Sequence, residues 1–572
     1  MRRDLVSTRM SPRTPSHTLI KEHQTMSLRR PSRRHAGLLA GIATTAFLLA
    51  ACSSGTTEAG SDESASTAAD APVDGGDLTF AIGNDPISLN PSGVGSGNDT
   101  FYVTRQLVDS LLWQDPADGS LKPWLATKWE ANADATQFTF TLRDDVTFSD
   151  GTPFTAESVK KNFDDAIAAG AKSSAAASFI GYAGTTVVDP TTVTVAFTTP
   201  NAAFPQASSS VALGLVADST LAIPFDDRAS GTGVVGTGPF TLDHYTKDTE
   251  TVLKARPEYA WGPAGRENTG KAHLDSVTFQ VIPEAGVRTG ALTSDQVNVI
   301  GGVQPTDIAT LEDSGFDVVH RANPGITFGL TFNEAGALGS DPAVREAIAL
   351  TVNPTEVRDT ALNDGFAVAQ GPLASTTPGV ADVSTSIVTD PKKAASVLEK
   401  AGWAKGADGI YAKDGKPLAP VLVWITNFSP NQTSVELIQQ ELKANGIDAQ
   451  LWSGAVPDFQ AKLKEGSFDL VWGNLSRADG DVLRTQYSTA ATNFYKLADP
   501  DLEALLQKQL TIGDPTERDA VLADAQERLV TQHHVVPVHE LTTFLGLDTD
   551  VHDVQLGADS RLDQLTQAWI AG

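Results

Sequence analysis

Residues 276–302, SVTFQVIPEAGVRTGALTSDQVNVIGG, decide the fold class of this 572-residue chain. The stretch 276–283 alternates apolar and polar side chains as a β-strand does, 284–295 has helical spacing, and 296–302 is again strand-like. The residues that follow, as far as Asn323, repeat the helix and the strand. Strands and helices that alternate along the chain are typical of a layered α/β architecture. The sequence therefore predicts an α/β fold.

The same alternation continues on both sides of this stretch. On the N-terminal side we expect strands at 77–82 and 137–143, a helix at 98–113 capped by Asn98, and a helix at 155–170 capped by Thr155. On the C-terminal side we expect helices at 391–403 and 434–446 and strands at 419–426, 447–454 and 468–474. No repeat of fixed period is present. A chain of this length needs two or more lobes, because one core does not grow that large.

The N-terminal 76 residues have a different character from the rest. An uncharged run from Ala36 to Ala51 follows a basic segment and ends in Leu-Ala-Ala before Cys52, the single cysteine of the chain. A basic head, a short apolar segment and small residues are typical of a secretory signal, so we expect 1–51 to be removed, with Met26 as the true start. The order Leu-Ala-Ala-Cys resembles the lipobox of bacterial lipoproteins, which implies a diacylated Cys52. The alternative is that Cys52 is a small buried residue of a membrane segment.

Residues 53–76, SSGTTEAGSDESASTAADAPVDGG, contain one large apolar side chain. Such a segment buries too little surface to fold, so we expect 52–76 to be the lipidated cysteine and a disordered tether. These features place the protein on the outer face of the cytoplasmic membrane, at the cell surface or in the periplasm, held by lipid.

The net charge of the chain limits the kinds of partner that it can bind. Residues 1–51 hold nine of the 42 basic and two of the 70 acidic residues, so residues 52–572 carry a net charge of −35. A surface this acidic repels nucleic acid and anionic headgroups, so we expect no nucleic-acid partner. With Cys52 acylated no disulfide can form.

Several motifs in order resemble family 5 of the bacterial extracellular solute-binding proteins, the peptide- and nickel-binding components of ABC importers. They are ISLNP (87–91), LKPWLATKWE (121–130), FTFTLRDDVTFSDGTPFTAESVKKNFD (138–164), GTGPF (236–240), TFNEAGALGSDPAVREAIAL (331–350), AASVLEKAGW (394–403) and EGSFDLVW (465–472). The resemblance covers nearly all of residues 77–572. It implies a two-lobed, periplasmic-binding-protein-like (Venus flytrap) α/β fold with an extra inserted subdomain in the first lobe. The expected division is 77–328 plus 541–572 for the first lobe, with the insertion at about 110–232, and 329–540 for the second.

Three sequence patterns suggest nucleotide or metal binding, but each lacks the structural context that such a site needs. Gly231–Gly236 has the glycine spacing of a dinucleotide loop, and 265–272 nearly matches a P-loop, but neither follows a buried strand. His533, His534 and His539 with Glu540 could suggest a metal site. On a strand His534 and His539 would point to opposite faces; His533 and His539 could share a face, but we favour a structural role for them. No nucleophile elbow or cysteine nucleophile is present, so we predict no enzyme activity, no cofactor and no resident metal.

The stretch Phe468–Arg484, FDLVWGNLSRADGDVLR, is the most informative for ligand binding. In α/β proteins ligands bind beyond strand ends, so the loop after Trp472 should face the cleft. In peptide-binding members that the chain resembles, an aspartate in this loop pairs with the peptide α-ammonium, and here Ser476 or Arg477 takes that position. Arg477 suits a carboxylate or another anion. The alternative is that Arg477 points to solvent or pairs with Asp479 or Asp481.

Other candidate ligand contacts lie near strand ends. Asn84, Asn427 and Asn474 follow strands and can both donate and accept hydrogen bonds. Trp424 and Trp472 are also candidates, although core packing is the usual role of such residues.

We therefore expect a lipid-anchored, monomeric receptor that captures a short peptide, a di- or oligopeptide, between two lobes and delivers it to an ABC permease. Closure should be driven by affinity that differs between the open and closed states. The alternatives are a nickel chelate or another anionic solute and, outside this class, a secreted hydrolase.

Overall fold

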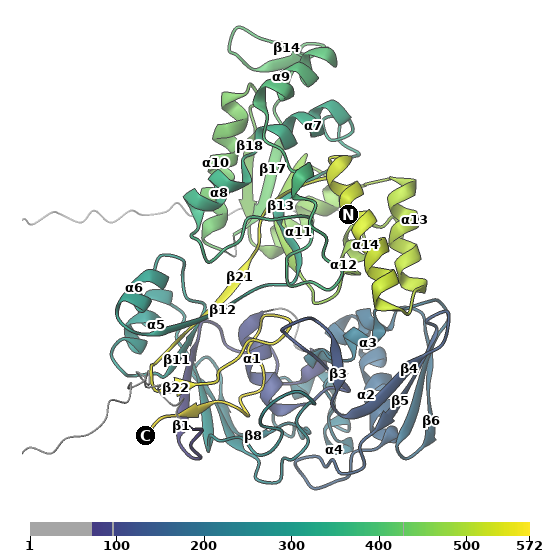
Figure 1. Ribbon diagram of the computed structural model, residues 1–572, viewed down its shortest axis with the longest axis vertical. Helices are drawn as coiled ribbons and strands as arrows, with labels where there is room; N and C mark the ends of the chain where they lie inside the picture. The colour runs from purple at the N-terminus through teal and green to yellow at the C-terminus, as the bar shows by residue number, and fades with distance from the viewer. Residues whose placement is uncertain (1–70, 94–96, 427) are drawn as a thin grey trace, which may run out of the picture. The chain divides into compact units, whose positions relative to one another are not determined.

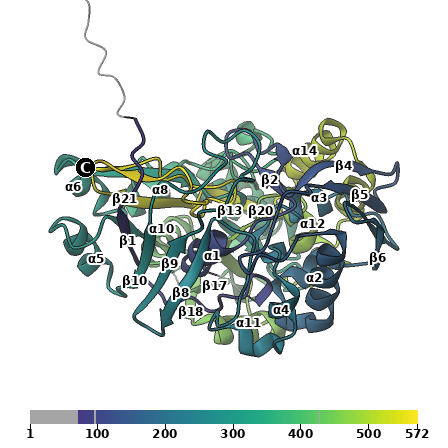
Figure 2. The same cartoon turned by 90° about the horizontal axis from the view of Figure 1, so that it is seen from below.

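The computed structural model describes residues 71–93, 97–426 and 428–572 (Figure 1). Three large β-sheets organise this part of the chain. Sheet I has seven strands in the order β12-β21-β11-β1-β10-β9-β8. Figure 2 shows β1, β10, β9 and β8 side by side. The strands of sheet I are β1 (Asp77–Ile82), β8 (Phe240–Thr246), β9 (Glu250–Ala255), β10 (Ser276–Val281), β11 (Val299–Gly301), β12 (Asp317–Ala322) and β21 (Thr542–Leu547).

Strand β1 lies at the centre of sheet I and pairs in parallel with both β10 and β11. Its alternating side chains place Leu78, Phe80 and Ile82 in the core, where the Phe80 ring lies 5.5 Å from Phe279 of β10. The stretch 276–302 thus forms a strand, a helix and a strand, which confirms the α/β prediction. The helix in between, α5 (Ala285–Leu292), is shorter than predicted.

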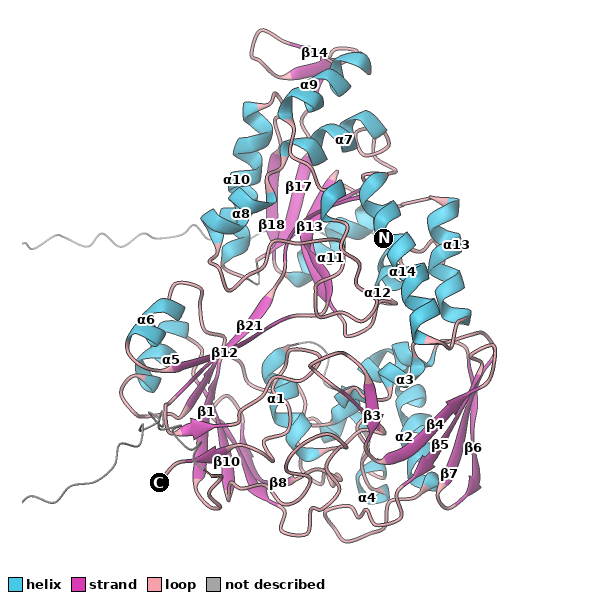
Figure 3. Ribbon diagram, viewed as in Figure 1, coloured by secondary structure: helices cyan, strands magenta, loops and turns pink. Residues whose placement is uncertain are grey.

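Sheet II has five strands in the order β18-β17-β19-β13-β20, and Figure 3 shows helices around it. Its strands are β13 (Gly325–Phe332), β17 (Val421–Ile425), β18 (Gln450–Gly454), β19 (Leu470–Ser476) and β20 (Val535–His539). The helices of this half of the chain are α7 (Pro342–Thr351), α8 (Pro354–Ala361), α9 (Pro391–Lys400), α10 (Pro430–Ala444), α11 (Val456–Glu465), α12 (Val482–Tyr487), α13 (Pro500–Lys508) and α14 (Pro515–Thr531).

Sheet III has four antiparallel strands in the order β4-β5-β7-β6 and packs with α2 around a phenylalanine-rich core. Its strands are β4 (Ala126–Ala131), β5 (Gln137–Leu142), β6 (Tyr182–Asp189) and β7 (Thr192–Phe197). In the described residues up to 313 the α-helices, besides α5, are α1 (Asn98–Leu107), α2 (Ala156–Ala169), α3 (Phe204–Ala207), α4 (Asp218–Leu221) and α6 (Ile308–Asp313). The short pairings are β2 (Leu112–Gln114) with β3 (Leu121–Pro123), β14 (Ala404–Lys405) and β15 (Tyr411–Lys413) with β16 (Lys416–Pro417), and β22 (Val551–His552) with β23 (Trp569–Ile570).

The chain passes from sheet I to sheet II after β12 and returns before β21. These two crossings lie side by side, because β12 and β21 pair in antiparallel register. The backbone N–H of Asn323 donates to the Leu541 carbonyl at 2.7 Å, and the Thr543 hydroxyl donates to Asn323 Oδ1 at 2.9 Å. Sheet II begins at Gly325, a few residues before the predicted division at 328–329, while the lobe boundaries as such stay a prediction.

Helices α1 and α10 also differ from the sequence prediction in their boundaries. Helix α1 ends at Leu107 instead of 113, because Val108 is extended and Leu112 to Gln114 pair as β2. Asn98 is the first helical residue and does not cap the helix; the residue before it is Gly97. Helix α10 begins at Pro430, four residues before the predicted start, with the proline in the first helical turn. None of the helices in the described ranges combines the length and the apolar character needed to cross a membrane.

Candidate ligand-binding site

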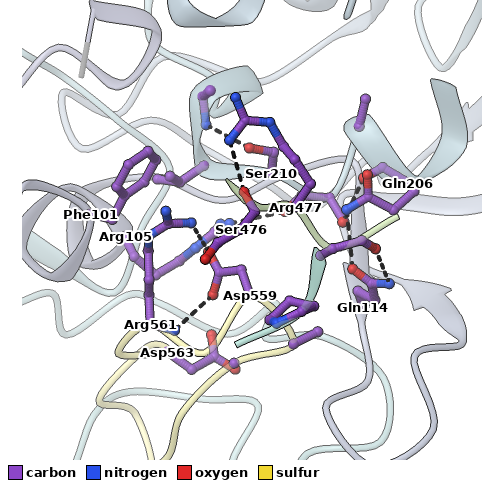
Figure 4. Close-up of a pocket in the computed structure, with 18 of the residues that line it drawn as sticks. Phe101, Arg105, Gln114, Gln206, Ser210, Ser476, Arg477, Asp559, Arg561 and Asp563 are labelled. Carbon is purple, nitrogen blue, oxygen red and sulfur yellow. Dashed lines mark hydrogen bonds and ion pairs between the residues drawn. The ribbon is translucent and has the colours of Figure 1, made fainter. Parts of the chain in front are cut away.

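A cavity of about 270 Å³ is lined by residues of α1, β2, the segments 174–178 and 206–212, the end of β19 and the C-terminal segment 557–563. We call it the arginine cavity, because Arg105 of α1, Arg477 after β19 and Arg561 of the C-terminal segment face it (Figure 4). Its polar lining also includes Gln114, Gln206, Ser210, Ser476, Asp559 and Asp563. A concave site with a few convergent polar groups is the usual form of a small-molecule site.

Two of the three guanidinium groups are held in place by neighbouring groups. Arg105 donates to Ser110 Oγ and to the Ser209 carbonyl, both at 3.0 Å. Arg561 donates from Nε to Asn98 Oδ1 at 3.1 Å and lies over the Phe101 ring, 4.2 Å from its centroid. Burial lowers the pKa of Arg105. Both side chains are therefore positioned before a ligand arrives.

Arg477 is held much less. The only hydrogen bond of its side chain in the described structure runs from Nη1 to the carbonyl of Ser476 at 2.8 Å. Asp479 instead forms a bidentate ion pair with Arg518 (2.5 and 2.8 Å), and Asp481 pairs with Arg484 at 2.6 and 2.7 Å. The alternative that Arg477 pairs with Asp479 or Asp481 is therefore wrong. Arg477 as a residue is exposed to solvent, so the other part of that alternative stands. Partial desolvation at the cavity wall, and after it the charge of Arg561, lowers the pKa of Arg477.

The carboxylates of the arginine cavity do not balance its three cations. Asp563 is paired with Arg266 at 2.5 Å, outside the cavity lining, and Asp559 with Arg561 at 3.2 Å. In the part of the chain that the structure describes, neither Arg105 nor Arg477 forms an ion pair with a carboxylate. The charges of Asp563 and Asp559 act on Arg105 without an ion pair, and Arg477 has no carboxylate beside it. Two guanidinium groups that line one cavity without a paired carboxylate suit a carboxylate or a similar anion, which can accept two parallel hydrogen bonds from a guanidinium.

A second cavity, of about 460 Å³, lies where the ends of β1 and β11 and the start of β21 meet residues near sheet II. We call it the aromatic cavity, after Phe328, Phe366, Phe428 and Phe544 in its lining. Two predicted residues, Asn84 and Asn474, line it as well. The structure thus divides the predicted contacts between two cavities: Ser476 and Arg477 in the first, Asn84 and Asn474 in the second.

The two predicted tryptophans lie in the core of sheet II instead. Trp472 is 1% exposed, stacks on Phe328 with ring centroids 5.5 Å apart, and donates from Nε1 to Asn431 Oδ1 at 3.0 Å. Trp424 is buried in the same cluster. Neither indole lines either cavity, because side chains of a buried strand point into the packed layers on both faces. Asn427 and Cys52 lie outside the described residues.

The sequence interpretation missed several cavity residues. Arg105 and Asp99 lie on a helix that was read only for its apolar face, and Arg561 and Asp559 lie in a C-terminal segment without a motif. Asp99 and Arg105 are the two charged residues of this amphipathic helix, and their charge was the one available signal.

The histidines that suggested a metal site have other neighbours. His534 has Glu334 at 2.5 Å from Nδ1 and Asp499 at 3.1 Å from Nε2, on opposite sides of the ring. His539 is buried against Phe328, and burial lowers its pKa to about 4. Among the described residues no cluster of three or more metal-ligating side chains occurs.

Two sheets joined by paired crossings, with a charged cavity lined from both sides, define a periplasmic-binding-protein type of fold. The chain belongs to the bacterial extracellular solute-binding proteins, family 5, whose family model matches residues 120–494. It is thus a solute-binding protein of an ABC importer, a class whose members bind and do not catalyse.

Curated relatives and solved structures agree with this family. The chain is 27% identical over 476 residues to the nickel-binding periplasmic protein of Escherichia coli, covering 80% of this chain and 88% of that protein. It is 25% identical over 504 residues to the E. coli dipeptide-binding protein, covering 82% and 90%. The structure of NikA from Brucella suis in complex with Fe(III)-EDTA matches with a TM-score of 0.74 and 25% identity over 86% of this chain and all of that chain. CtaP from Listeria monocytogenes, an ABC transporter substrate-binding protein, has the same fold, with a TM-score of 0.76 and 20% identity over 87% of this chain and all of that one.

Proposed function

We propose that this receptor captures a small solute through a carboxylate group, and that a short peptide held by its terminal carboxylate is the first candidate. The observation that carries the proposal is the pair of guanidinium groups, Arg105 and Arg477, that face one cavity without a carboxylate partner in the described chain. Relatives named for dipeptide binding support a peptide. A bidentate arginine–carboxylate contact supplies both affinity and orientation.

A metal chelate or another anionic solute is the second candidate. The loop 476–481 offers no free acid for a peptide ammonium, because Asp479 and Asp481 are both paired with arginines. The similar NikA of Brucella suis was solved with Fe(III)-EDTA, a chelate rich in carboxylates. Such a ligand would satisfy both arginines without needing an acid from the protein.

Capture requires two lobes, for which we keep the division 77–328 plus 541–572 and 329–540, with the insertion at about 110–232. Arg105 and Arg561 belong to the first lobe and Arg477 to the second, so an anion between them would hold the lobes together. Closure then depends only on the extra contacts that the closed form makes with the ligand. The closed surface is what an ABC permease would recognise.

We further propose that Cys52 carries the lipid and that 53–76 is the tether. Mass spectrometry of the N-terminal peptide of membrane-purified protein should show Cys52 as the diacylated first residue. Cys52→Ala should move the protein from the membrane fraction to the soluble extracytoplasmic fraction. An unmodified Cys52 in the mature protein would contradict the anchor.

Two experiments test the solute proposal. Mass spectrometry of molecules released from natively produced protein should identify a compound with at least one carboxylate. Calorimetry with that compound should show at least about tenfold weaker binding to Arg477→Ala, because a charged hydrogen bond contributes about 1.5–3 kcal/mol. Lys416→Ala, an exposed change of the same charge, is the control and should bind normally. Equal affinity in Arg477→Ala would remove Arg477 from the site.

A further inference from the structure

Residues 363–377 lie in the connection between α8 and α9 and run beside both crossings between sheets I and II. We call them the hinge strap. They are attached to sheet II, because Val368 bridges to His539 at the end of β20 and Leu373 bridges to Ile326 at the start of β13. The hinge strap is therefore part of the sheet II side of the molecule.

The hinge strap binds the first crossing at Ala322 and Gly325. The N–H of Gly325 donates to Thr377 Oγ1 at 2.8 Å, and the N–H of Ala374 donates to the Gly325 carbonyl at 2.8 Å. The hydroxyl of Thr376 donates to the Ala322 carbonyl at 2.9 Å. Ala322 is the last residue of β12, so the Thr376 bond joins the sheet II side to sheet I.

The hinge strap also binds Glu540, in the second crossing. Glu540 is 1% exposed, and its two carboxylate oxygens accept from the N–H of Ser375 at 2.8 Å and from its hydroxyl at 2.9 Å. The N–H of Glu540 donates in turn to the Ala367 carbonyl at 2.9 Å. Burial raises the pKa of Glu540, and the bonds from Ser375 oppose this shift. Hydrogen bonds to a carboxylate are stronger than those between neutral groups, so this contact fixes the strap on the crossing.

The hinge strap reaches the sheet I side at a second place. Asn363 Nδ2 donates to the carbonyl of Pro305, between β11 and α6, at 2.9 Å. The ring of Phe366 lies 5.1 Å from that of Phe544 on β21. Two side-chain bonds to backbone carbonyls, from Thr376 and Asn363, thus join the two sides in addition to the crossings themselves.

We propose that the hinge strap restrains the hinge, so that the angle between the two lobes varies little in the ligand-free protein. A change of this angle requires new backbone torsions at 323–324 and 540–541. Because the strap is attached to sheet II, such a change moves the two acceptor carbonyls of the sheet I side away from Thr376 and Asn363. Each other angle then costs these bonds, which keeps its population low. The inference rests on the two-lobe capture proposed above, and it holds for any solute.

Distances between two spin labels, measured without ligand, test this restraint. Glu312→Cys on α6 and Gln440→Cys on α10 place one exposed label on each lobe, in a Cys52→Ala background that leaves no other thiol. Thr376→Val keeps the branched shape of the side chain and removes its bond to sheet I. The fraction of molecules outside the main wild-type distance peak should rise about fivefold, because a neutral hydrogen bond contributes about that factor to an equilibrium.

The matched control is Thr389→Val. The Thr389 hydroxyl donates to the Val352 carbonyl at 2.8 Å inside the second lobe, so the same kind of bond is lost away from the crossings. Its distances should match those of the wild type. Unchanged distances in Thr376→Val, or an equal broadening in Thr389→Val, overturn the inference.

Glu540→Gln is the second strap variant. It keeps an oxygen for the N–H of Ser375 but loses the charge, so its distances should broaden as well, and it decides the matter if Thr376→Val does not fold. The solute proposal is judged separately, by the binding of the co-purified solute to Arg477→Ala. Equal affinity there would remove the carboxylate contact and leave the restraint standing, whereas unchanged distances in the strap variants would leave the carboxylate contact standing.

Discussion

The arginine cavity and the aromatic cavity each contain a buried or half-buried aspartate, and the two aspartates differ in the partners that the protein gives them. Asp563 of the arginine cavity accepts from Arg266 at 2.5 Å and from Trp113 Nε1 at 3.1 Å, and its side chain is 6% exposed. Among the described residues, Asp99 of the aromatic cavity accepts hydrogen bonds from the amide groups of Asn84 and has the charge of Arg288 nearby, without an ion pair. One carboxylate is fully compensated by the protein, and the other is left with unused bonding capacity.

This difference distinguishes a carboxylate that stabilises the fold from one that is available to a ligand. A buried ion pair fixes geometry, because either partner alone would leave an uncompensated charge. Asp563 thereby anchors the C-terminal segment that carries Arg561 against residue 266. A carboxylate without a cation destabilises the folded protein unless something else supplies the cation. The comparison predicts that removing the first aspartate costs stability and that removing the second does not.

The largest change in the free energy of unfolding is expected from Asp563→Ala. The change leaves the Arg266 guanidinium, itself 2% exposed, without its counter-charge, and should lower the free energy of unfolding by about 3–5 kcal/mol. Urea unfolding followed by tryptophan fluorescence measures this. Asp559→Ala, in the same segment but with a more exposed ion pair, is the control and should cost about 1 kcal/mol or less. Equal losses in the two variants would show that burial of the pair is not the cause.

The second prediction uses an unpaired carboxyl away from both cavities. Glu441 of α10 accepts one backbone N–H, from Asn353 at 3.2 Å, while its Oε1 is buried without a partner. Burial, with repulsion from Glu356, raises its pKa to about 7. A raised pKa in the folded state gives stability that is complete below about pH 4.5 and is lost as the pH rises through about 7.

Glu441→Gln should therefore be more stable than the wild type at pH 8, by roughly 2 kcal/mol, and equal to it near pH 4.5. Unfolding free energies measured across this range give the two curves. Glu436→Gln, an exposed change on the same helix, should follow the wild-type curve. If the stability curve of Glu441→Gln does not diverge from those of the wild type and Glu436→Gln between pH 5 and 8, the raised pKa of Glu441 is contradicted.

These particular residues also show what the sequence could and could not predict. Strand β1 matched its predicted range because alternation at period two is a local signal, and Thr155 was found as the cap of α2 for the same reason. Helix α1 ended six residues early because Asp109 is bound by Trp261 and Gln564, distant partners that no local pattern contains.

The residues of the candidate site also fall into those that a local pattern predicts and those that depend on distant packing. Asn84 follows β1 and Arg477 follows β19, so the strand-end rule placed these two residues. Asn474 and Ser476 lie within β19, because the strand continues to Ser476 where a loop was predicted after Trp472. Arg561 reaches the cavity only because the chain returns to sheet I at β21 and its last residues pack beside α1. Trp472 was a candidate because a strand end and a core position look alike in sequence until the packing is known.

The third prediction concerns Asp99 itself. Since burial raises its pKa, the charged form opposes folding, and the stability it gives is present only at low pH. Asp99→Asn keeps an oxygen for the Asn84 donors and should raise the free energy of unfolding at pH 7 by about 0.5–1 kcal/mol. The gain should vanish near pH 3. A destabilised Asp99→Asn at pH 7 would mean that this carboxylate is compensated within the protein, and would end the contrast with Asp563.

The smallest effect on stability is expected at Arg477. Among the described residues its side chain forms one hydrogen bond, to the carbonyl of the preceding residue, and its charge lies near that of Arg561, so the folded protein gains little from this side chain. Arg477→Ala should change the free energy of unfolding by less than about 0.5 kcal/mol in the absence of ligand. Added ligand should then raise the thermal midpoint of the wild type much more than that of the variant, because stabilisation by a ligand grows with its affinity. A large loss of stability in ligand-free Arg477→Ala would place this arginine with Asp563, among the groups that hold the fold, and not among those left available for a solute.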